Sequence, residues 1–169
     1  MAKEKKDKKD KKEKKEKKEE DVKMTEANEV EVERWVSPIA HPLADKKLSK
    51  KLFKTVTGAS KVKHVRRGVK EVQKALRKGE KGLVVLAADV SPIDVTSHFP
   101  VFCEEKDVPY IFVTSREQLG QASSTRRPTS VAMVVLGGKS KDMNAAVEYK
   151  STFDECLAQA KDLREQLAQ

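Results

Sequence analysis

The feature that most constrains the fold is an unbroken run of apolar and glycine residues from 82 to 88. A run that is short, rich in branched side chains and free of alternating polar positions is typical of a strand buried on both faces. Similar runs follow at 110–114 and 130–136, and a short segment with two β-branched residues, 62–66, precedes it. Helical patterns separate these runs. The chain is therefore predicted to form an α/β domain, a three-layer αβα sandwich around a mixed sheet of about four strands.

The helices are expected where apolar residues recur every three or four positions. They occupy 43–58, 69–78, 115–122 and 145–167. The first pairs an apolar face with a lysine-covered face and is expected to end near Gly58. Ser115, with Gln118 three residues later, has the spacing of a helix-capping box.

The segment between the first two long runs is predicted to hold two short helices. Ser91 followed by Pro92 is typical of an N-cap with proline in the first helical position. That helix is expected to reach Ser97, and Pro100 is expected to begin a second helix that continues to Asp107.

Residues 62–66 fit two interpretations. Val65 and Val69 share a helical stripe, which would allow one continuous helix. Gly68 interrupts that stripe, and the segment is short and β-branched. We therefore expect a short strand, a turn at Arg67 and Gly68, and a helix from Val69.

The chain divides into a tail, a lead-in and one domain. Residues 1–20 contain 11 Lys, 7 Asp or Glu and no apolar side chain beyond Met1 and Ala2. Such a segment cannot bury enough surface to offset its conformational entropy, so 1–28 is predicted to be a disordered tail. Residues 29–42 are expected to be extended, and 43–168 to form the αβα domain.

No apolar run is long enough to span a membrane and no signal-like stretch begins the chain, which predicts a soluble intracellular protein.

Positive charge is concentrated in one window. Between Lys46 and Lys81 there are 14 Lys and Arg against 2 acidic residues, a net of +12, while the whole chain carries +9. The remainder is therefore −3. A concentration of one sign on a small domain repels itself and is usually matched by a polyanion, which predicts RNA binding.

No catalytic, metal or cofactor site is predicted. The two cysteines and three histidines have no ligand spacing, so free buried thiols are expected and no metal. Gly137-Gly138-Lys139-Ser140 follows an expected strand as a phosphate-binding loop would, but the first glycine of that motif would fall at Met133. Glu71 stands alone in the basic window. Composition favours an ion pair with Lys74, although a carboxylate can also accept hydrogen bonds from base N–H groups.

A longer pattern matches a known family. Arg67-Gly68-x-Lys70-Glu71-x-x-Lys74 resembles the Gly-x-Asn-Glu-x-x-Lys signature of the kink-turn RNA-binding family of ribosomal proteins. Further matches follow in the family's order: Ala88-Asp89-x-x-Pro92, His98-Phe99-Pro100, Cys103-Glu104, Val108-Pro109-Tyr110, Leu119-Gly120 and Arg127-Pro128. They cover 66 to about 134. Residues 65–72 and 127–131 most resemble the nucleolar branch of the family, that of the H/ACA ribonucleoprotein.

The resemblance implies an RNA surface made of two segments. One comprises Arg66, Arg67, Gly68, Lys70, Glu71 and Lys74; the other comprises Thr125, Arg126 and Arg127, with Val95 as an apolar contact. Lys70 stands where the family usually has asparagine. Lysine offers charge without an acceptor, so weaker kink-turn selectivity is expected.

The resemblance also implies a role. The expected function is that of a non-catalytic core subunit of the nucleolar H/ACA particle that guides pseudouridylation of ribosomal RNA. Its expected partners are the H/ACA guide RNA, a small bridging protein and a separate pseudouridine synthase, in the nucleus and nucleolus, with no cofactor, membrane or small-molecule substrate. A large-subunit ribosomal protein and a box C/D-type kink-turn-binding protein of the same fold are the alternatives.

Overall fold

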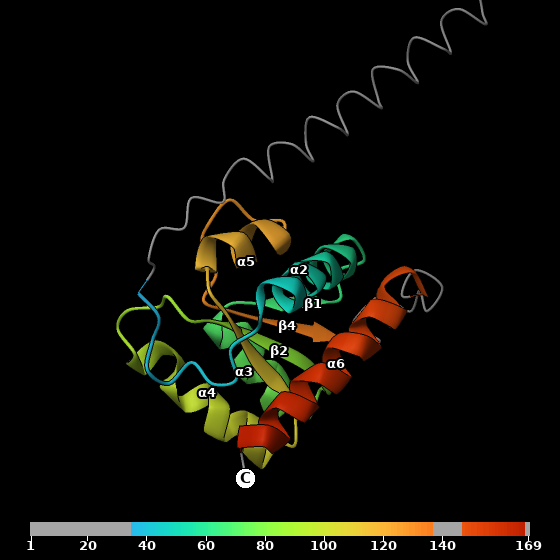
Figure 1. Ribbon diagram of the computed structural model, residues 1–169. Coiled ribbons are helices and arrows are strands. Elements are labelled where there is room, and N and C mark those ends of the chain that lie inside the picture. The colour runs from blue at the N-terminus through green and yellow to red at the C-terminus, as the bar shows by residue number, and fades with distance from the viewer. Residues whose placement is uncertain (1–34, 137–146, 168–169) are drawn as a thin grey trace, which may run out of the picture. The chain divides into compact units, whose positions relative to one another are not determined.

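A mixed four-stranded sheet lies at the centre of the computed structural model, which describes residues 35–136 and 147–167 (Figure 1). The strands are β1 (Val65–Arg67), β2 (Gly82–Ala87), β3 (Tyr110–Val113) and β4 (Val131–Val135). Their order is β1-β4-β2-β3. β2 and β3 are parallel, whereas β4 is antiparallel to both β1 and β2. The predicted mixed sheet is confirmed. The predicted tail, residues 29–34 of the lead-in and the Gly137–Ser140 motif lie outside the described residues.

Helices cover both faces of the sheet, as the sandwich prediction requires. The helices are α2 (Lys46–Lys61), α3 (Val69–Arg77), α4 (Asp94–Glu105), α5 (Arg116–Ala122) and α6 (Val147–Leu167). One core cluster joins α2, α5 and α6 to side chains such as Val85 of β2. The other joins α3 and α4 to the alternate side chains, such as Val84 and Leu86. Every residue of β2, β3 and β4 is buried, because each strand lies between two helical layers.

The prediction of two short helices between 91 and 107 is wrong. A single helix, α4, begins at Asp94 after Ile93 and runs through Pro100. Proline inside a helix removes one backbone hydrogen bond and costs roughly 3 kcal/mol. Phe99 and Cys103 lie on the buried side of α4 and are fully enclosed. We attribute the continuous helix to this packing against the sheet.

Three boundaries also differ from the prediction. α2 starts at Lys46 instead of residue 43, because the residues before it are extended and the Ala44 amide donates to the Phe112 carbonyl of β3 at 2.8 Å. α2 continues past Gly58 to Lys61. A Cβ at Gly58 would lie 3.0 Å from the Cβ of Tyr149, so the glycine allows α6 to approach rather than ending α2. β1 starts at Val65 instead of residue 62, because the turn that ends α2 occupies the residues before it.

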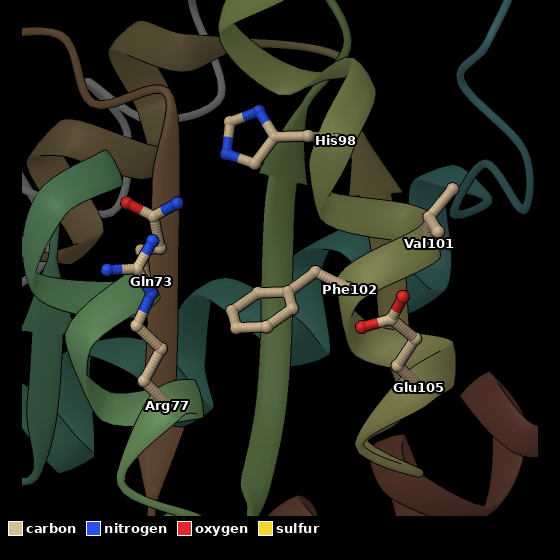
Figure 2. Close-up of a pocket in the computed structure, with 6 residues that line it drawn as sticks. All are labelled: Gln73, Arg77, His98, Val101, Phe102 and Glu105. Carbon is tan, nitrogen blue, oxygen red and sulfur yellow. The ribbon is translucent and has the colours of Figure 1, made fainter.

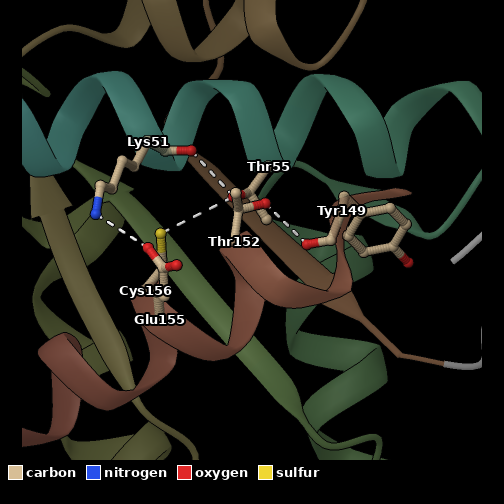
Figure 3. Close-up of polar contacts among 6 residues, drawn as sticks. All are labelled: Lys51, Thr55, Tyr149, Thr152, Glu155 and Cys156. Atoms are coloured by element: carbon tan, nitrogen blue, oxygen red, sulfur yellow. Dashed lines mark hydrogen bonds and ion pairs between the residues drawn. The ribbon is translucent and has the colours of Figure 1, made fainter. Parts of the chain in front are cut away.

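Polar contacts join α2 to α6 (Figure 3). Lys51 Nζ lies 3.0 Å from Glu155 Oε2, and the Thr55 hydroxyl lies 3.9 Å from the Sγ of Cys156.

Cys103 and Cys156 are both free and buried, as expected from the sequence. Burial raises the pKa of the Cys103 thiol to about 12. Within the described ranges, no helix combines the length and apolarity that a membrane crossing requires.

Candidate nucleic-acid interface

The turn between β1 and α3 is built around Gly68. Its φ of +84° is a value that side-chain-bearing residues rarely adopt, while a Cβ there would meet nothing within 4 Å. The Gly68 amide donates to the Val131 carbonyl at 2.8 Å, which fixes the turn against the start of β4. α3 begins at the next residue, Val69. The turn therefore presents open backbone at a helix N-terminus, where anions are stabilised.

Glu71 closes this turn from inside α3. Its Oε2 accepts a hydrogen bond from the backbone amide of Arg67 at 3.0 Å. A carboxylate in the first turn of a helix also interacts favourably with the helix dipole. Within the described part of the chain, this contact replaces the ion pair with Lys74 that composition favoured. One carboxylate oxygen thus supports the turn, and the exposed side chain keeps its second oxygen available to a ligand.

The loop between α5 and β4 is fixed to the same turn. Nη1 of Arg67 donates to the Ser123 carbonyl at 2.9 Å. The Thr125 amide donates to the Gly120 carbonyl at 3.0 Å, and its hydroxyl accepts from the Arg127 amide at 3.2 Å. A side chain of β1 thereby sets the position of a loop more than fifty residues further along the chain.

The turn and the loop border an open, shallow hollow of about 580 Å³. Its lining consists of Arg67, Gly68, Val69, Thr125, Arg127, Pro128, Thr129 and Ser130. The two segments that the resemblance predicted to act together are therefore adjacent. Sequence reasoning did not include Val69 or Pro128–Ser130 among the site residues. The Pro128–Ser130 segment lay within the family match, which could have indicated it.

Other predicted site residues lie around the hollow. Lys70 and Lys74 are exposed on α3, and Arg126 is exposed in the loop. None of the three lines the hollow. Each is an accessible cation that can contact phosphate at the edge of a ligand seated there.

The structure does not bring Arg66 and Val95 into this group. Arg66 Nε lies 3.1 Å from Glu80 Oε2, and the two side chains are 16% and 28% exposed. Neighbouring residues of a strand point to opposite faces, so Arg66 and Arg67 cannot both face the loop. Val95 is partly buried and packs against the core cluster of α2, α5 and α6. The ion pair of Arg66 and the core packing of Val95 keep both side chains away from the hollow, and the family pattern did not reveal these contacts.

The basic window is divided between two layers. α2 packs on one face of the sheet and α3 on the other. The charges between Lys46 and Lys81 thus do not form one face. The stretch from Arg67 to Lys74 adjoins the hollow directly.

A second hollow of about 400 Å³ lies between α3 and α4 (Figure 2). Gln73 and Arg77 of α3 line one side, and His98, Val101, Phe102 and Glu105 of α4 line the other. This lining holds one carboxylate and neither serine nor cysteine, so it offers no carboxylate pair or activated nucleophile. In the part of the chain that the structure describes, no group of three metal-ligating side chains occurs.

A mixed sheet covered by helices on both faces places the chain in the α/β class, and the N-terminus of α3 adds a basic hollow to it. The chain belongs to the ribosomal protein L7Ae/L30e/S12e/Gadd45 family, whose sequence model matches residues 50–144. The family predicted from the signature is confirmed.

Relatives in this family are close. The H/ACA ribonucleoprotein complex subunit nhp2 of Schizosaccharomyces pombe is 61% identical over 99 residues, which are 59% of this chain and 64% of that protein. The match therefore spans less than two thirds of that relative. The H/ACA ribonucleoprotein complex subunit 2 of Pongo abelii is 47% identical over 127 residues, 75% of this chain and 77% of that protein. Among solved structures, the Giardia lamblia 15.5kD RNA binding protein is similar with a TM-score of 0.59 and 33% identity, covering 72% of this chain and 99% of that chain.

Proposed function

We propose that this protein is an RNA-binding, non-catalytic core subunit of the H/ACA ribonucleoprotein. The observation that carries the proposal is its 45–61% identity to proteins named as subunits of that complex in yeast and animals, and to a protein named as subunit 2-like in a plant. The hollow of Gly68, Thr125 and Arg127 supplies a surface suited to RNA. The names of these relatives support the H/ACA particle over the ribosome or a box C/D particle.

RNA would be held chiefly through its phosphates. Arg67 and Arg127 line the hollow, and the open backbone at Gly68 allows a strand to approach the start of α3. Lys70 and Lys74 neutralise phosphates beside it. The free oxygen of Glu71 accepts a hydrogen bond from a base N–H group.

Within the particle the protein would position RNA for another subunit. We propose that the particle guides pseudouridylation of ribosomal RNA in ribosome biogenesis, in the nucleus and nucleolus. The chemistry would belong to a pseudouridine synthase, with a small bridging protein between the two subunits. The partners of this chain would be these proteins and an H/ACA guide RNA.

The RNA surface is tested by charge reversal at Lys74 and Arg126, which are exposed and belong to α3 and to the loop between α5 and β4. Arg67 is avoided because its side chain holds the Ser123 carbonyl. The double variant Lys74→Glu, Arg126→Glu should weaken binding of a guide-RNA hairpin and flatten the dependence of log K on log salt. The slope should change by roughly 0.7–0.9 for each phosphate that the variant no longer neutralises.

A matched control carries the same charge change on α6, at the exposed residues Lys150 and Lys161. Lys150→Glu, Lys161→Glu should retain nearly wild-type affinity and slope. Equal effects of the two double variants would contradict the assignment of the surface. Sequencing the RNA that copurifies with the full chain from nuclear extract tests the particle: H/ACA guide RNAs support it, and ribosomal RNA with large-subunit proteins would overturn it.

A further inference from the structure

The turn that follows helix α2 contains a lysine in a conformation that favours glycine. Lys63 has a φ of +59°. Its amide donates to the Ser60 carbonyl at 3.1 Å, and the next amide, that of His64, donates to the Ala59 carbonyl at 2.9 Å. These two bonds define a Schellman motif, in which the residue at the position of Lys63 is left-handed and most often glycine.

Three other helices end in the same way, and two of them have residues better suited to it. After α5 the left-handed residue is Ser124, with a φ of +57°, whose amide donates to the Gln121 carbonyl at 3.0 Å. The left-handed residue that follows α3 is Gly79, with a φ of +74°. The one that follows α4 is Asp107, with a φ of +51°. Aspartate tolerates the left-handed region because its short polar side chain can bond to nearby backbone. A lysine side chain lacks that advantage, so the charged residue at position 63 makes this turn less stable than glycine would.

The last turn of α2 contacts the loop between α5 and β4, which is called the RNA loop from here on. The hydroxyl of Ser60, in the last turn of α2, donates to the Ser123 carbonyl at 3.2 Å and lies 3.0 Å from the hydroxyl of Ser124. The same Ser123 carbonyl accepts from Arg67, whose side chain lines the hollow. Figure 1 shows α2 and α5 side by side. The C-terminal end of α2 is thus continuous with the wall of the hollow.

Two exposed cations occupy this end of the helix, Lys61 and Lys63. Among the described residues, neither forms a side-chain hydrogen bond or an ion pair. By contrast, Lys51 in the same helix is paired with Glu155. A free cation that is retained in an unfavourable backbone conformation next to a basic hollow is better explained by a ligand than by folding.

We propose that the RNA surface extends from the hollow onto the C-terminal end of α2, where Lys63, with Lys61 beside it, contacts RNA phosphate. The inference rests on the proposed function and adds a second strip of phosphate contacts to it. Lys63 is thus expected to strengthen RNA binding and to lower the Tm of the protein, and both quantities can be measured.

The decisive variants are Lys63→Gly and Lys63→Gln. Lys63→Gly should raise the Tm of the full chain by roughly 2–8 °C, because glycine adopts this φ without strain. Both variants should bind an H/ACA-type hairpin RNA about 5–8-fold more weakly at 0.1 M salt, with a salt slope lower by about 0.7–0.9, as expected when one phosphate is no longer neutralised. A more stable protein that binds RNA less well is the expected signature.

Two controls separate the causes. Asp107→Gly makes the same backbone change at the end of α4, and should raise Tm without weakening RNA binding. Lys47→Gln removes one exposed charge at the opposite end of α2, and should leave the salt slope unchanged.

An unchanged slope in both Lys63 variants, in a protein whose binding still depends on Lys74 and Arg126, would overturn this inference alone. A fall in Tm of Lys63→Gly would also overturn it, since the lysine would then be stabilising. A wild-type protein that does not bind RNA would overturn the proposed function together with it.

Discussion

Replacing Gly120 with alanine should separate the RNA loop from its support. Gly120 lies in α5, directly beneath the loop that carries Arg127. A Cβ at this position would lie 2.4 Å from the Arg127 carbonyl oxygen and 3.3 Å from the Cα of Pro128. The shorter distance is 1.0 Å below the 3.4 Å at which ordinary van der Waals contact begins. Because the opposing atoms are backbone, the loop itself must move.

Two effects of opposite sign determine the stability of Gly120→Ala. Alanine favours the helix by about 1 kcal/mol relative to glycine. Overpacking against fixed backbone costs about 1–3 kcal/mol. The free energy of unfolding should therefore fall by roughly 0–2 kcal/mol. A displacement of about 1 Å also moves Arg127, and removing one or two phosphate contacts weakens RNA binding about 5–8-fold for each contact at 0.1 M salt.

The assay combines urea unfolding with titration of a guide-RNA hairpin at several salt concentrations. Gly58→Ala is the comparison variant, because it adds a methyl group to a helical glycine whose nearest neighbour is the Cβ of Tyr149 at 3.0 Å, and not the backbone of the loop. It should leave RNA affinity within about threefold of wild type. Wild-type affinity and slope in Gly120→Ala would refute the claim that the position of this loop determines RNA binding.

Three further results are expected. Wild type should bind kink-turn and plain hairpin RNAs with similar affinity, and Lys70→Asn should raise the preference for the kink-turn by about 1–3 kcal/mol, a scale borrowed from DNA base contacts, in a competition titration. Arg66→Gln should lower the free energy of unfolding in urea by about 1 kcal/mol, because Glu80 loses its half-buried partner, and RNA affinity should stay within about threefold of wild type. Burial raises the pKa of Cys103 from 9.0 and of Tyr110 from 10.0, each to about 12. The unfolded chain releases these protons first, so Tm should fall by several degrees as pH rises from about 9 to 12. Cys103→Val should make the part of that fall just above pH 9 smaller, and burial of Cys156, whose pKa is also raised, should preserve the rest. A wild-type Tm that does not change over this range would contradict the prediction.

The sheet and most helices could be predicted from the sequence because burial on both faces leaves a strong local signal. The strand at 82–87 is apolar at every position, as a central strand requires. α4 could not be predicted in the same way, because proline indicates a helix start locally while the packing of Phe99 and Cys103 is a tertiary effect. The end of α2 was missed for a related reason. Lys63 adopts a conformation that only its hydrogen bonds reveal, and nothing in a lysine-rich sequence indicates it.

The candidate site was predicted in part. The family pattern correctly indicated that Gly68 and the loop at Thr125 to Arg127 lie together. Arg66 was included because adjacent arginines look alike in a sequence. Because successive residues of a strand point to opposite faces, the side chains of Arg66 and Arg67 lie on opposite sides of β1, and Arg66 pairs with Glu80. Charge counting identified a basic window but could not assign its lysines to a layer.

Photo-crosslinking of the full chain to an H/ACA guide-RNA hairpin, with mass spectrometry of the linked peptides, would locate the bound RNA on the protein without any substitution. We expect crosslinks in two peptides, one spanning 67–74 and the other 123–130, with a third at the end of α2 around Lys63. Crosslinks confined to α6, or to the hollow between α3 and α4, would contradict the assignment of the RNA surface.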